Sequence, residues 1–167
     1  MNAVVLDTNV AVDWFIPSAE GDAYSLPLET LQAEGKVSFY VPLHFDVEVV
    51  RVLRKHHMRN SRRFPRQWLS SSLQVLDLMR IDSVAQGINF ELLGELARTF
   101  NLDVPDVPFL SLARDRGLPI ATHAIRASSR RVKPGTSCTG RHRLALAEWC
   151  RLGLLQAVDA LEGALSM

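Results

Sequence analysis

The stretch AVVLDTN, residues 3–9, changes from four apolar residues to three polar ones. A short, partly β-branched apolar run of this kind predicts a strand buried on both faces of a parallel sheet. Ligands of open α/β sheets bind at the carboxyl ends of the strands, so an acid directly after such a strand points into the expected site. Asp7 is therefore the first candidate functional residue, with a helix N-cap as its alternative role.

Strand-like and helix-like segments alternate along the chain beyond this stretch. Further strands are predicted at about 37–41 and 119–122, and helices at about 9–15, 19–33, 42–57, 66–79, 88–100 and 106–116. We expect Pro42 to open the third of these helices and Gly117 to end the last. The alternation predicts a three-layer α/β/α domain with a central, mostly parallel sheet. We place this domain at residues 1–125, followed by a divergent basic linker and a C-terminal helix at 126–167.

The composition restricts the class of protein. The chain has 167 residues, of which 47% are hydrophobic, and no apolar run is long enough for a membrane span. The apolar start is too short for a secretory signal, so we expect a soluble cytoplasmic protein without a membrane partner. The two cysteines are too few for a disulfide framework.

Charge is distributed unevenly although the net charge is only +1. Residues 51–66 and 126–143 contain no acid and hold 13 of the 19 basic residues. Such a run is often only a solvated helix end, but it is also typical of a groove that binds a polyanion. The candidate polyanion-binding residues in the first run are Arg51, Arg54, Lys55, Arg59, Arg62 and Arg63.

Two further acids lie where the predicted topology can bring them toward Asp7. Glu48 lies on the predicted helix after the second strand, and Asp106 begins the helix before the last strand. Each has an ordinary alternative: a surface ion pair for Glu48 and a cap for Asp106. Asp46 and Asp103 are their nearby competitors. Three carboxylates gathered at one sheet edge would repel each other unless a cation neutralised them, and hard oxygen ligands select magnesium or manganese.

Four segments, in this order, resemble those of a known family. They are residues 4–17 (VVLDTNVAVDWFIP), 41–53 (VPLHFDVEVVRVL), 102–113 (LDVPDVPFLSLA) and 119–122 (PIAT). The resemblance is to the PIN-domain nucleases, and most closely to the VapC toxin ribonucleases of bacterial toxin-antitoxin pairs. It favours Glu48 over Asp46 as the second acid.

The resemblance implies a metal-dependent endoribonuclease that uses Mg²⁺ or Mn²⁺. Asp7, Glu48 and Asp106 would be the catalytic and metal-binding acids, with Thr8, Asn9 and Thr122 supporting them. The expected partners are an RNA substrate, a small antitoxin protein and a second copy of the chain in a homodimer.

The resemblance ends at position 124. The family usually carries a fourth acid there, and this chain has Ala124. An alternative function is therefore a catalytically weakened or inactive PIN-fold protein that binds RNA or an antitoxin. Two more candidate classes are a haloacid-dehalogenase-like phosphatase, which would need a second acid where this chain has Asn9, and a plain structural protein.

Overall fold

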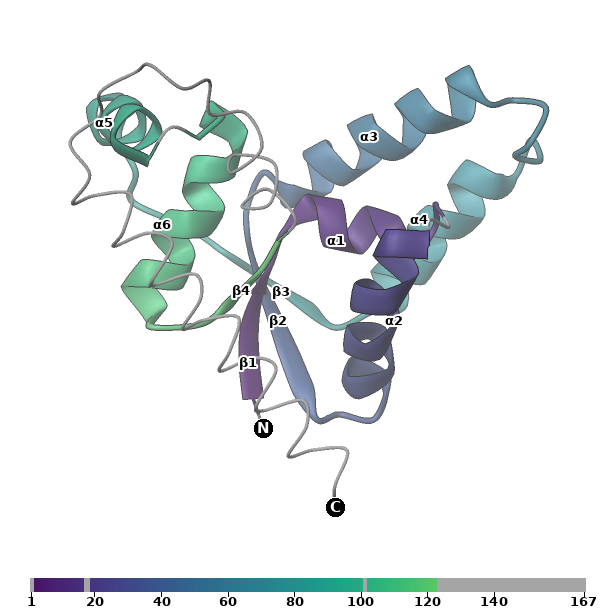
Figure 1. Cartoon of the computed structure of the whole chain (residues 1–167), viewed down its shortest axis with the longest axis horizontal. Helices are drawn as coiled ribbons and strands as arrows, with labels where there is room; N and C mark the ends of the chain where they lie inside the picture. The colour runs from purple at the N-terminus through teal and green to yellow at the C-terminus, as the bar shows by residue number, and fades with distance from the viewer. Residues whose placement is uncertain (1, 17–18, 101, 123–167) are drawn as a thin grey trace.

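The computed structural model describes residues 2–16, 19–100 and 102–122. Four strands and six α-helices alternate along this part of the chain (Figure 1). In chain order the elements are β1 (Asn2–Leu6), α1 (Thr8–Asp13), α2 (Ala19–Ala33), β2 (Val37–Pro42), α3 (Phe45–Arg59), α4 (Trp68–Leu78), β3 (Ile81–Val84), α5 (Phe90–Phe100), the short 3₁₀ helix η1 (Val104–Asp106), α6 (Val107–Arg116) and β4 (Ile120–Ala121).

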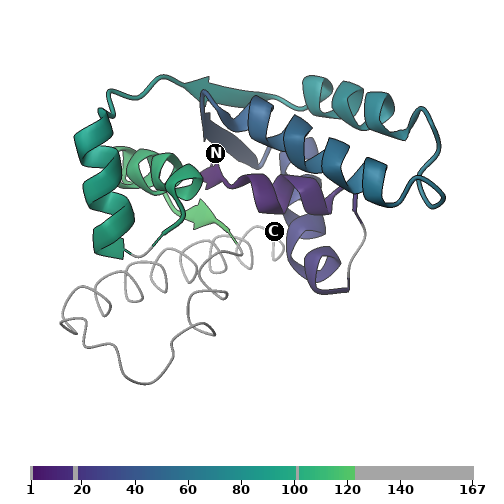
Figure 2. The same cartoon turned by 90° about the horizontal axis from the view of Figure 1, so that it is seen from above.

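The strands form one parallel sheet in the order β3-β2-β1-β4. Helices α5 and α6 lie on one side of it and α1 to α4 on the other (Figures 1 and 2). The predicted three-layer α/β/α class is therefore confirmed. Strand β1 pairs with β2 on one side and β4 on the other, so its carboxyl end, where Asp7 follows, lies at the centre of the sheet edge.

The start of the third helix was predicted too early. Pro42 does not open the helix but ends β2, and α3 begins at Phe45. The fixed φ angle of proline suits an extended residue as well as a first helical turn. Proline is tolerated here because the pairing of β2 with β1 already ends at Tyr40, so its missing N–H removes no hydrogen bond to β1.

Strand β3 was missed by the sequence analysis. Its four residues, Ile81 to Val84, include two exposed polar side chains, so the segment has no apolar run. The strand exists because it pairs with β2, from Phe39↔Ile81 to Pro42↔Val84. A short edge strand of this kind depends on its neighbour rather than on its own propensity.

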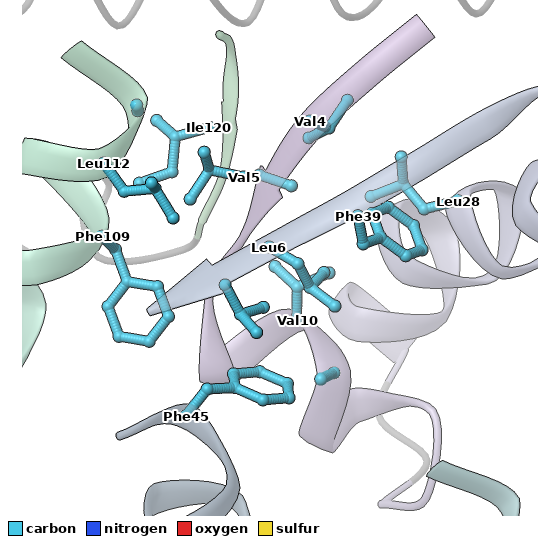
Figure 3. Packing of buried hydrophobic residues seen from close by; sticks show 14 of the residues in the cluster. Val4, Val5, Leu6, Val10, Leu28, Phe39, Phe45, Phe109, Leu112 and Ile120 are labelled. Atoms are coloured by element: carbon cyan, nitrogen blue, oxygen red, sulfur yellow. The ribbon is translucent and has the colours of Figure 1, made fainter. Parts of the chain in front are cut away.

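The hydrophobic core joins both helical layers to the sheet (Figure 3). Leu6, Phe39 and Phe109 are among the largest fully buried side chains. The Phe45 ring at the start of α3 meets the Phe109 ring of α6 edge-on, with 6.5 Å between centroids. This contact fixes the first turns of α3 and α6 beside the carboxyl end of β1, where the acids lie.

Candidate active site

Asp7 is held in a buried position at the end of β1. The residue is 3% exposed, and its backbone N–H donates a hydrogen bond to the Ala121 carbonyl oxygen at 3.0 Å. The Thr122 hydroxyl donates to Oδ2 of Asp7. Asp7 is also the N-cap residue of α1, yet its side chain makes no cap hydrogen bond. The backbone amides of Asn9 and Thr8 at the start of α1 nevertheless favour its ionised form.

Glu48 lies in the first turn of α3, facing α1. Its side chain is 15% exposed, and its Oε2 accepts a hydrogen bond from Oγ1 of Thr8 at 3.0 Å. Arg51, one turn later, places a guanidinium nitrogen 3.5 Å from Oε1. The competing acid Asp46 is exposed. Of the two acids on this turn, only Glu48 is bonded to the residue that follows Asp7.

Asp106 lies at the start of α6, in the helical layer on the other side of the sheet. It ends η1 and is the N-cap residue of α6, again without a side-chain cap hydrogen bond. Its residue is partly buried, whereas the competing acid Asp103 is exposed. The Asp106 side chain is thus free of the capping role that sequence alone allowed.

His44 was not predicted as a site residue. Its Nε2 lies 3.2 Å from the carbonyl oxygen of Pro105 and 3.8 Å from Oε2 of Glu48. The imidazole also meets the Phe109 ring edge-on at a centroid distance of 5.2 Å. His44 therefore ties the segment that carries Asp106 to the helix that carries Glu48. The available signal was its spacing of four residues before Glu48 on one helix face.

The three acids influence one another electrostatically. Burial, opposed by the Thr122 hydroxyl and the nearby amides of Asn9 and Thr8, raises the pKa of Asp7, and the Glu48 charge raises it further. Burial and the charges of Asp7, Asp103 and Glu48 raise the pKa of Asp106 to about 6. The folded chain has therefore brought like charges close enough to oppose the ionisation of Asp7 and Asp106.

The carboxylate oxygens of the three acids suit a hard divalent cation, but they do not form a complete coordination shell. Among residues 2–16, 19–100 and 102–122, no three acidic, histidine or cysteine side chains converge closely enough to form a metal centre. Hydrogen bonds from Thr8 and Thr122 hold one oxygen each of Glu48 and Asp7. A shared ion would thus need bridging water or rotated carboxylates.

The remaining predicted residues are Asn9, the basic residues of α3 and its connection to α4, and the C-terminal positions. The amide nitrogen of Asn9 lies 3.5 Å from Oδ2 of Asp7. The basic residues are exposed on α3 and on the connection to α4. In that connection, Phe64 stacks on Trp68, the first residue of α4, with 4.2 Å between ring centroids, and the Arg63 guanidinium lies 5.6 Å from the Phe64 ring centre. Position 124 and the segment 126–167 lie outside the described residues.

No helix in the described part of the chain combines the length and apolar character that a bilayer crossing requires. No curated protein sequence matches the chain. The sequence model of the PIN domain matches residues 4–124, which includes all three acids and Thr122. PIN domains are generally nucleases that use divalent metals. By this match over most of its length, the chain belongs to the PIN domain family.

Proposed function

We propose that the chain is a metal-dependent endoribonuclease of the VapC type, the toxin of a toxin-antitoxin pair. The observation that carries the proposal is that Asp106 lies close enough to Asp7 and Glu48 for their charges, together with burial and the charge of Asp103, to raise its pKa to about 6. A fold that gathers carboxylates against their own repulsion is typical of a cation site.

The ion would be Mg²⁺ or Mn²⁺, because all three acids offer hard carboxylate oxygens. Asp7, Glu48 and Asp106 would hold it, in part through water. Such an ion supplies an activated water and stabilises the oxygen that leaves the phosphodiester.

The neighbouring polar residues keep the acids in place. Thr122 orients Asp7 from β4, Thr8 orients Glu48 from α1, and Asn9 lies against Asp7. Hydrogen bonds of this kind fix which carboxylate oxygen faces the ion. His44 adds a link between the second and third acids.

The RNA would be held by the basic residues that begin beside Glu48. Arg51, Lys55, Arg59, Arg62 and Arg63 are exposed along α3 and its connection to α4, and guanidinium groups bind phosphate well. We propose the antitoxin partner on the family resemblance alone.

A homodimer is supported by apolar side chains on a second face of α3. Val47 is 71% exposed and Met58 is 64% exposed, and Val50 lies between them. Exposed apolar side chains along one helix face can pack against the same face of a second copy of the chain.

The test is cleavage of RNA by the purified full chain with Mg²⁺ or Mn²⁺, compared with the same protein in a chelator. The Asp7→Asn protein is the matched control because it keeps the shape of the side chain. We expect cleavage that needs metal and Asp7. Persistent cleavage by a pure Asp7→Asn protein would reject the site, and absence of cleavage by the native chain at any metal concentration would favour the inactive PIN-fold alternative raised by Ala124.

A further inference from the structure

Three cations form a single line on α3. Arg51, Lys55 and Arg59 are four residues apart, and Arg51 follows Glu48 by three residues. Residues three or four apart lie on one face of a helix, so this line begins at the acid site and continues along α3. Figure 1 shows α3 extending from α1 outward to its connection with α4.

The other exposed face of α3 has a different character. Val50 and Met58 lie there with Arg54 between them, and all three are exposed. Arg54 lies four residues from each of these apolar side chains and about 100° around the helix axis from Lys55, so it shares a row with them rather than with Lys55. Arg54 thus carries the same charge as the line residues but lies in the adjacent row of the helix.

The line is uniformly positive beyond Arg51. Residues 49–66 contain no acid. Arg51 is paired with Glu48, whereas no ion pair joins Lys55 or Arg59 to another residue that the structure describes. Glu48 and Arg59 are eleven positions apart, which corresponds to about 16 Å along the helix axis.

We propose that the Arg51-Lys55-Arg59 line binds successive phosphates of one RNA strand on one side of the cleaved bond. The inference rests on the proposed function, because the acids define where cleavage occurs. Cations about 6 Å apart along a straight helix suit a flexible single strand, which can follow them with one phosphate per helical turn. The protein accordingly requires a substrate whose unpaired strand extends at least about three nucleotides past the cleavage site on that side.

The experiment measures binding without cleavage. The full chain, kept in a chelator, is titrated with fluorescein-labelled oligouridylates of increasing length, and the dissociation constant is measured by anisotropy over a range of salt concentrations. We expect affinity to rise with length and then level off. Lys55→Ala and Arg59→Ala should each weaken binding of the longer strands several-fold and lower the salt slope by about 0.7, the value for one phosphate contact on a single strand.

Two variants act as controls. Arg54→Ala removes the same charge from the other face of the same helix, and it should change the slope less than either line variant. Arg98→Ala removes an exposed charge from α5 and should change nothing. Equal effects of Arg54→Ala and Lys55→Ala, affinity independent of length, or equally tight binding of a duplex of the same length would overturn the inference.

The two proposals fail in different ways. Graded, face-dependent binding by a chain that cleaves no RNA would leave the cation line standing and reject the nuclease function. Metal-dependent cleavage together with identical binding by all four variants would reject the line and leave the nuclease function standing.

Discussion

The acid site and the cation line differ in the number of elements that form them and in their burial. The acids follow β1, lie on α3 and begin α6, and all three are partly or fully buried. Asp7 and Glu48 are also hydrogen-bonded by residues distant in sequence. The cations come from one helix and are exposed. The site therefore depends on the whole fold, whereas the line depends only on the period of α3. Substitutions that disturb the fold should reduce RNA cleavage first. Substitutions in the line should reduce affinity for RNA alone.

The largest effect should separate two acids on the same helix turn. Glu48→Gln should reduce RNA cleavage to background, because Glu48 is bonded to Thr8 and faces the other acids. Asp46→Asn, at an exposed acid two residues away, should leave cleavage unchanged. Cleavage rates at saturating Mn²⁺ would measure both. The reverse order would show that the family pattern was aligned to the wrong acid.

Removing a supporting hydrogen bond should cost less than removing an acid. Thr122→Val keeps the shape of the buried side chain but removes the hydroxyl that donates to Asp7. We expect Mn²⁺ affinity to fall about 10- to 100-fold, as is usual when a hydrogen bond to a metal ligand is lost. Calorimetric titration would show it. Unchanged affinity would mean that the hydroxyl does not orient the carboxylate that binds the ion.

The core contact between the two helical layers offers a third test. Phe109 is 1% exposed and touches both Phe45 and His44. Phe109→Ala should lower the free energy of unfolding by about 3–5 kcal/mol. Urea denaturation would measure this loss. Lys55→Ala is the control, because an exposed side chain should change stability by less than about 0.5 kcal/mol; similar losses in both proteins would contradict the division between site and line.

The smallest effect concerns pH in the absence of metal. The pKa of Asp106 is 3.8 in the absence of interactions and about 6 in the fold, so between these values the folded state holds more protons than the unfolded state. The free energy of unfolding should therefore fall as pH rises through this window. Asp106→Asn removes this contribution and should stabilise the metal-free chain at pH 7 by about 1 kcal/mol, a figure reduced for the partial exposure of Asp106.

Urea denaturation in a chelator, repeated from neutral pH down to about the unfolded pKa of aspartate, would check this prediction. The advantage of Asp106→Asn should shrink as the pH falls. A native chain that is the more stable of the two at pH 7 in a chelator would contradict the raised pKa of Asp106.

The same contrast explains what could be predicted from the sequence. The strand before Asp7 and the C-terminal end of α6 at Gly117, where φ is 62°, were visible because local residue types decide them. The separation of Lys55 from Arg54, which are neighbours in sequence, follows from helical period. The α/β/α class followed from alternation. The link from His44 to Pro105 spans 61 residues, and β3 exists only through its pairing with β2, so neither had a local signal.

Spacing alone also could not assign the acids their roles. Asp7 and Asp106 both occupy N-cap positions, as their sequence contexts predicted, and only the structure shows that neither side chain makes the cap hydrogen bond. Glu48 was preferred to Asp46 by resemblance rather than by helical angle. The burial of one and the exposure of the other came from packing of α3 against α1.

The most direct test is calorimetric titration of Mn²⁺ into the full native chain, with Asp7→Asn, Asp106→Asn and the exposed-acid control Asp46→Asn alongside. If Asp7, Glu48 and Asp106 share an ion, the native chain and Asp46→Asn bind Mn²⁺ with the same affinity, and the other two variants lose this binding. Equal binding by all four proteins, or none by the native chain, would contradict a shared metal site.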